Sequence, residues 1–188
     1  TCFILQSYLF PVFPHIGVLL LNGVAGSGKS ALGKVIADLS FNGDFIISPT
    51  VASVRRHLNE TRGTLVLDDF EKLNSSSDLQ NFRSQLCGGY KTDAITTLCG
   101  DKNKREELWI GSPKVITSIN GFEPTLLTRS FIINTLANNG RFKSTLPSAE
   151  EISDERGRTL VFALKSWPGI YKIYKDYDEG SSRDSDIK

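Results

Sequence analysis

Short apolar runs alternate with segments of helical spacing over most of the chain. Five runs rich in β-branched and large apolar residues predict strands, at residues 18–22, 45–48, 64–68, 114–119 and 130–136. Between them, apolar residues at helical spacing predict four helices. One begins directly after Lys29, and the others cover residues 51–59, 78–86 and 124–128. Such alternation is typical of a parallel sheet covered by helices on both faces. The sequence therefore predicts an α/β fold with a central parallel five-stranded sheet flanked by helices.

Residues 94–110 interrupt this alternation. Two β-prone runs, 94–99 and 107–110, flank a polar turn at residues 100–105, which predicts a β-hairpin inserted before the fourth strand of the sheet. From Pro147 a further helix is predicted to run to about Trp167. Ser148 and Glu151 are spaced as a capping box at its start.

Composition limits the class of protein without naming a partner. The 188 residues are 39% hydrophobic and 23% charged, which fits one globular domain. The net charge of +1 indicates neither a nucleic acid nor a membrane. The apolar residues 2–21 are interrupted by polar residues and prolines, too often for a membrane span, and show no basic leader. The chain begins at Thr1 and has no methionine, so we expect it to be a piece of a longer polypeptide.

The three cysteines are Cys2, Cys87 and Cys99, an odd count with no C-x-x-C pair. This pattern argues against a disulfide framework and predicts a reducing, cytoplasmic location with buried thiols.

Residues 23–30 read G-x-x-x-x-G-K-S and stand between the first predicted strand and its helix. Glycines let several backbone N–H groups face one anion, and the start of the helix adds a positive dipole end. Lys29 would reach the β- and γ-phosphates of ATP, and Ser30 would ligate Mg²⁺. The predicted nucleotide-binding residues are Gly23, Ala25, Gly26, Ser27, Gly28, Lys29, Ser30 and Ala31.

The third predicted strand ends in two carboxylates, Asp68 and Asp69. Ligands of doubly wound sheets sit at the carboxyl ends of the strands. We expect Asp68 to hold Mg²⁺ through water and Asp69 to polarise the attacking water. Glu71 is an alternative for the second role, and a capping role in the following turn is an alternative for the pair.

Two further polar residues lie near strand ends. Asn120 follows the fourth strand, where a neutral amide can hydrogen-bond a γ-phosphate and the attacking water. The Asn120-Gly121 pair is equally typical of a turn. Arg129 precedes the fifth strand, where a guanidinium can neutralise charge on a phosphate held by a neighbouring subunit. A surface salt bridge is the other interpretation of Arg129.

In this order, the loop at 23–30, Asp68-Asp69, the hairpin, the strand leading to Asn120, and Arg129 resemble an AAA+ ATPase core of the ASCE type of P-loop NTPases. The closest resemblance is to the superfamily III helicases of viruses, phages and mobile elements. It implies Asn120 as sensor 1, Arg129 as an arginine finger acting in trans, and catalytic roles for Lys29 and Asp69. It also implies that the hairpin-tip residues Lys102, Lys104 and Arg105 contact a DNA backbone.

The resemblance further implies a DNA helicase or replication ATPase that forms a homo-oligomeric ring, a hexamer in this family, on single-stranded DNA. The expected division of the chain is a lead-in at 1–15, an ATPase core at 16–146, a helical segment at 147–179 and a disordered tail at 180–188. The chain departs from the family in two respects. The third strand ends in Asp68-Asp69, whereas Asp-Glu is the common ending in the family. At the hairpin tip, the negative charges of Asp101, Glu106 and Glu107 nearly cancel the positive charges of the three basic residues.

Two other functions share the phosphate-binding motif. One is a nucleotide switch or remodelling ATPase that acts on a protein partner. The other is a small-molecule kinase, although the arginine-rich lid typical of such enzymes is not evident in the sequence. Dependence of turnover on oligomers and single-stranded DNA, rather than on a small acceptor, distinguishes the motor from the kinase. The switch is favoured if Asp69→Ala leaves turnover unchanged because there was none.

Overall fold

The computed structural model of the chain describes residues 1–47, 50–68, 86, 88–99, 105–119, 122, 124–137 and 145–185. Within them, five parallel strands form one sheet in the order β2-β3-β6-β1-β7. These strands are β1 Val18–Gly23, β2 Asp44–Ile47, β3 Leu65–Asp68, β6 Lys114–Ser118 and β7 Ser130–Thr135. All five predicted strands are thus confirmed within one or two residues at their ends.

Helices connect these strands as the apolar spacing predicted. They are α2 Lys29–Leu39, α3 Val51–Thr61 and the short α5 Pro124–Leu127. The helix predicted at 78–86 lies outside the described residues except for Leu86, which is buried in the core. The predicted hairpin is confirmed: β4 Ile95–Cys99 pairs antiparallel with β5 Arg105–Trp109, and both precede β6 along the chain.

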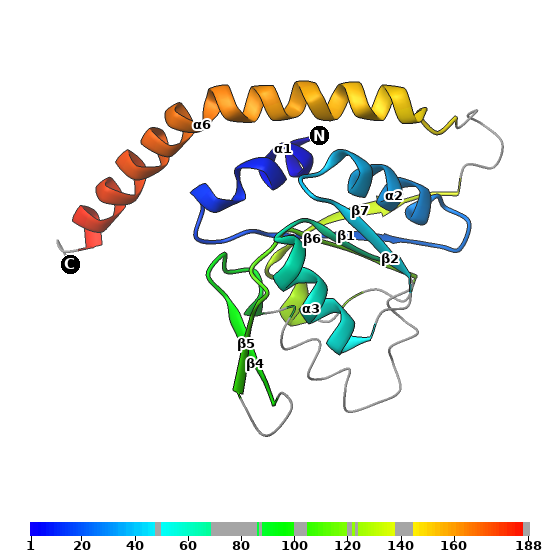
Figure 1. Cartoon of the computed structure of the whole chain (residues 1–188), viewed down its shortest axis with the longest axis horizontal. Coiled ribbons are helices and arrows are strands. Elements are labelled where there is room, and N and C mark those ends of the chain that lie inside the picture. The colour runs from blue at the N-terminus through cyan, green and yellow to red at the C-terminus, as the bar shows by residue number, and fades with distance from the viewer. Residues whose placement is uncertain are drawn as a thin grey trace.

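The sheet separates two apolar layers. Side chains that alternate along β1 point to opposite faces, so Leu19 and Leu21 pack with α2 while Val18 and Leu20 pack with α3 and α5. Figure 1 shows α1 and α2 between the sheet and the long helix α6, with α3 and the β4–β5 hairpin on the opposite side. The interior strand β1 is buried from Val18 to Leu21 because it has a neighbouring strand on each side and helices on both faces of the sheet.

The first fifteen residues are more regular than the predicted lead-in. They form α1, Cys2–Leu9, and a 3-10 turn, Phe10–Val12. Tyr8 donates a hydrogen bond from its hydroxyl to the Leu39 carbonyl at 3.0 Å, which fixes α1 to the end of α2. Cys2 is exposed, so the prediction of a buried thiol is wrong there. None of the helices in the described part of the chain is both long and apolar enough to cross a membrane.

The C-terminal helix α6 runs from Ala149 to Ser185, well past its predicted end at Trp167. Its predicted capping box is confirmed by hydrogen bonds of Ser148 and Glu151 in both directions, at 2.7 and 3.2 Å. Hydrogen bonds to the carboxylate from the Ser148 backbone and, to a lesser extent, from its side chain hold the pKa of the Glu151 carboxyl below its usual value. Pro168 lies inside α6 and removes one helical hydrogen bond, and α6 bends along its length (Figure 1).

Packing explains why α6 continues beyond Pro168. Ile170 joins an apolar cluster with Tyr8 and Leu9 of α1, and the rings of Tyr174 and Phe13 meet edge to face at 5.5 Å. These contacts keep the chain helical beyond the proline, because tertiary packing outweighs local propensity. Residues 180–185, which the composition predicted to be part of a disordered tail, belong to the same helix.

The base of the hairpin is closed by a buried lysine at the start of β6. The Lys114 ammonium donates hydrogen bonds to the carbonyl oxygens of Gly89 at 2.8 Å, Ile110 at 2.7 Å and Ser112 at 2.9 Å. Gly89 precedes β4, whereas Ile110 and Ser112 follow β5. One side chain therefore ties both ends of the inserted hairpin to the central sheet.

Candidate nucleotide-binding site

The loop at residues 23–30 joins the carboxyl end of β1 to the start of α2. Gly26 and Gly28 have φ angles of 75° and 84°, which side chains of L-residues disfavour. A Cβ atom on Gly23 would overlap Thr135 at the end of β7. The three glycines are thus required, two by backbone conformation and one by close approach.

Lys29 folds back over this loop. Its side chain is largely buried, and its ammonium donates to the Gly23 carbonyl at 2.7 Å and the Val24 carbonyl at 2.8 Å. A longer contact of 3.5 Å reaches the Ser27 hydroxyl. The cation is therefore held inside the glycine loop, on partners that a bound anion could replace.

A second group of polar atoms lies beside the loop. Asp68, at the end of β3, is 6% exposed and accepts hydrogen bonds on Oδ1 from the Ser30 hydroxyl at 3.1 Å and the Thr117 hydroxyl at 2.5 Å. The two residues predicted to serve Mg²⁺, Ser30 and Asp68, are thus brought together from α2 and β3. Hydroxyl and carboxylate oxygens are the donors that Mg²⁺ prefers, so the group fits this ion.

Sequence reasoning missed Thr117 and the end of β7. Thr117 follows two apolar residues in β6, and that strand lies between β1 and β3. On β7, the Thr135 hydroxyl lies 2.7 Å from the Ser27 hydroxyl and donates to the Asn22 carbonyl at 3.2 Å. The available signal was a pair of polar residues, Asn134 and Thr135, that ends an apolar strand. This polar pair indicates a place in the site only once β7 is known to lie beside β1, and the sequence pattern does not give that strand order.

Arg129 lies at the amino ends of the parallel strands, whereas the 23–30 loop lies at their carboxyl ends. Its carbonyl accepts a hydrogen bond from the Val18 N–H at 3.0 Å, and Val18 begins β1 whereas Gly23 ends it. Five residue steps of an extended strand span about 17 Å. Within one subunit, the structure therefore does not bring Arg129 together with Lys29. The guanidinium lies over the ring of Tyr90, 4.9 Å from its centroid.

Several predicted site residues lie outside the described residues: Asp69, Glu71, Lys102, Lys104 and Asn120. Arg105 is described, and it is the first residue of β5 rather than part of the predicted turn. It is exposed and pairs with Glu107 at 3.4 Å. The strand begins there because Arg105 pairs with Cys99 across the antiparallel ladder.

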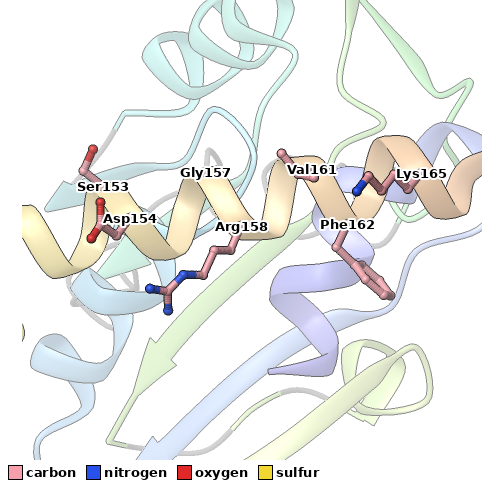
Figure 2. Close-up of a pocket in the computed structure, with 7 residues that line it drawn as sticks. All are labelled: Ser153, Asp154, Gly157, Arg158, Val161, Phe162 and Lys165. Atoms are coloured by element: carbon pink, nitrogen blue, oxygen red, sulfur yellow. The ribbon is translucent and has the colours of Figure 1, made fainter.

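A surface pocket of about 710 Å³ follows α6, far along the sequence from these motifs. Figure 2 shows its lining residues on that helix, with Arg158 and Phe162 extending to one side and Ser153 and Val161 to the other. None of them belongs to the 23–30 loop or to the Asp68 group. We therefore assign this pocket no role in nucleotide binding.

Comparison with known proteins supports the architecture. Neither a protein-family model nor a curated protein sequence matches the chain. Among solved structures, the chain is similar to the crystal structure of JCV helicase bound to a substituted N-phenylacetamide. The TM-score is 0.51 at 16% sequence identity, over 98% of this chain and 56% of the helicase chain.

The chain has a helicase-like P-loop NTPase fold. At this identity the similarity concerns the fold, and the chain spans little more than half the length of that helicase structure. The parallel five-stranded sheet, its flanking helices and the hairpin inserted before β6 agree with the architecture that the sequence predicted.

Proposed function

We propose that the chain is the ATP-binding and ATP-hydrolysing motor domain of an AAA+ protein, a DNA helicase or replication ATPase of phage or mobile-element type. One observation carries the proposal: a glycine loop holds the Lys29 ammonium on its carbonyls, and the next residue, Ser30, donates a hydrogen bond to the Asp68 carboxylate. Cation, anion-binding backbone and metal-binding oxygens meet at the carboxyl ends of β1 and β3, where such sheets bind ligands.

The loop would bind the phosphates of ATP. Its N–H groups and the first turn of α2 form the anion cradle, from Gly23, Ala25, Gly26, Ser27, Gly28, Ser30 and Ala31. Lys29 would exchange its bonds to the Gly23 and Val24 carbonyls for bonds to the β- and γ-phosphates. Since Lys29 is already largely buried and held in the loop, little reordering is required for that exchange.

Ser30 and Asp68 would hold Mg²⁺, Ser30 directly and Asp68 through water. When bound, the ion supplies charge neutralisation between the β- and γ-phosphates. Thr117 keeps the Asp68 carboxylate oriented by donating to Oδ1. Asp69 would orient and polarise the attacking water, and Asn120 would hydrogen-bond both that water and the γ-phosphate, roles that we propose from the sequence motif.

Arg129 would act on the nucleotide of a neighbouring subunit. Its place at the edge of the sheet opposite Gly23 supports a role in trans, because it cannot serve its own loop. This proposal entails a homo-oligomeric ring, of six subunits by analogy with superfamily III helicases. The core at 16–146 would form the ring, with residues 147–179 as a helical extension. The hairpin would contact single-stranded DNA through Lys102, Lys104 and Arg105.

ATP turnover measured against protein concentration, with and without single-stranded DNA, tests the proposed function. We expect the specific activity to rise with concentration, because Arg129 is supplied by a neighbour, and to rise further with DNA. A linear rate that ignores DNA contradicts the helicase proposal. Nucleotide binding without turnover indicates a switch, turnover only with a small acceptor indicates a kinase, and no binding at millimolar MgATP contradicts all of them.

Thr117 offers a test of the metal group. Replacing Thr117 with valine keeps the volume but removes the hydroxyl that donates to Asp68 at 2.5 Å. We expect about tenfold more Mg²⁺ to be needed for half-maximal turnover, since partners that orient a metal-binding carboxylate typically contribute that much. A magnesium titration of turnover measures it. Thr96 of β4 provides the control, because Thr96→Val changes the hairpin alone, and equal Mg²⁺ requirements in both variants would contradict the role of Thr117.

A further inference from the structure

We propose that Tyr90 is a positioning residue for Arg129 and joins that arginine to the base of the hairpin. The inference rests on the proposed function, which gives Arg129 its role on a neighbour's nucleotide. It comes from a three-residue contact at the edge of the sheet opposite the nucleotide loop. The Arg129 guanidinium lies 4.9 Å from the centroid of the Tyr90 ring, and the His15 ring stacks on Tyr90 at 5.1 Å with an angle of 19°.

The ring restrains a side chain that is otherwise exposed. A long arginine side chain on a surface samples many rotamers, and each unproductive rotamer lowers the fraction of subunits that can reach a neighbour. A guanidinium over an aromatic face is held by the ring quadrupole through the face of the cation and not through its N–H donors. Tyr90 can therefore orient Arg129 without occupying the donors that a phosphate would need.

Tyr90 is itself firmly placed. Its carbonyl accepts a hydrogen bond from the Ile16 N–H at 2.7 Å, and the next residue, Lys91, forms a β-bridge with His15. Two residues further on, the Thr92 N–H donates to the Pro14 carbonyl at 3.0 Å. The segment that carries the Tyr90 ring is thus hydrogen-bonded to the segment that leads into β1.

The same segment leads into the hairpin. Gly89, next to Tyr90, accepts a hydrogen bond from the buried Lys114 ammonium, and β4 begins at Ile95. The Trp109 indole at the end of β5 donates to the Thr92 carbonyl at 2.7 Å, which bonds the returning strand to the same segment. A displacement of the hairpin base would therefore move Tyr90, and with it Arg129. The hairpin proposed to contact DNA and the arginine proposed to act in trans are therefore connected through Tyr90.

The test compares Tyr90→Leu, Tyr90→Phe and Arg129→Ala in the full chain. We expect Tyr90→Leu to lower kcat by about two- to fivefold, the range that an exposed cation–π contact contributes. The KM for ATP should stay close to that of the unaltered protein, because the proposed contact of Arg129 acts on charge in the transition state of the neighbour's reaction and not on binding of the nucleotide. Tyr90→Phe keeps the ring and should retain turnover, while Arg129→Ala should lose more than Tyr90→Leu.

A matched control comes from α6, where the Lys175 ammonium lies 5.3 Å from the centroid of the Tyr171 ring. Tyr171→Leu breaks a similar contact and should leave kcat unchanged. NMR relaxation of the Arg129 Nε–H group gives a readout independent of turnover. Its order parameter should fall in Tyr90→Leu and recover in Tyr90→Phe.

The outcomes separate the inference from the proposed function. Full kcat and an unchanged order parameter in Tyr90→Leu, with Arg129→Ala impaired, overturn the inference and leave the function standing. Full turnover in Arg129→Ala overturns the role of the arginine and therefore the inference. A parent chain that binds ATP but never hydrolyses it overturns the proposed function itself.

Discussion

Replacing Lys29 with alanine is expected to lower ATP turnover by at least about a hundredfold while leaving the fold intact. The loss is large because an oriented cation at the transferred phosphate acts where charge develops, and removing one such donor typically costs two to three orders of magnitude in kcat. Stability should change little. The hydrogen bonds of Lys29 to the Gly23 and Val24 carbonyls are only partly buried, so water can replace the ammonium. Steady-state kinetics and circular dichroism measure the two effects.

Lys34 is the matched control for this experiment. It lies on the same helix, more than half of its side chain is exposed, and it forms an ion pair with Asp38 one turn further along. Lys34→Ala should change turnover by less than a factor of about two, since surface pairs of this kind contribute little. If Lys29→Ala keeps more than about a third of the parent rate, the 23–30 loop does not bind the phosphates of the hydrolysed nucleotide.

Replacing Lys114 with methionine is expected to lower the free energy of unfolding by about 2–4 kcal/mol. The substitution keeps a long apolar side chain but removes a donor from three carbonyl oxygens, those of Gly89, Ile110 and Ser112. A buried acceptor left without a partner costs about 1–3 kcal/mol, and the sum is reduced because burying the ammonium is itself unfavourable. Urea unfolding followed by circular dichroism provides the measurement. Lys34→Met, at an exposed site, should fall within about 0.5 kcal/mol of the parent.

The pH dependence of the free energy of unfolding provides a second test of the contribution of Lys114. Burial lowers the pKa of the Lys114 ammonium to about 7. Between that value and its usual value of 10.5, the unfolded chain binds a proton that the folded chain does not. The Lys114 contribution to the free energy of unfolding therefore rises with pH across this window. The stability difference between the parent and Lys114→Met should grow from pH 7 to pH 10, and a difference that shrinks would contradict this account.

Local patterns were sufficient for most of the architecture. The five strands, the helix after Lys29, the hairpin and the capping box of Ser148 and Glu151 follow from periodicity, turn residues and side-chain hydrogen bonding, which act within a few residues. Where the pattern failed, long-range packing was the reason. The helix α6 continues past Pro168 because Ile170 and Tyr174 pack against the N-terminal segment. No window of sequence around the proline contains that information.

The sequence by itself determined the conformation of the 23–30 loop, since the glycine conformations at Gly26 and Gly28 and the position of Lys29 are properties of one continuous segment. Only the tertiary structure decided which distant residues accompany it. Strand order places Thr117 against Asp68 and Thr135 against Ser27. The fold also places Arg129 at the amino ends of the strands, beside Tyr90. The physical reason is that strand neighbours are selected by burial of both sheet faces, which depends on the whole chain at once.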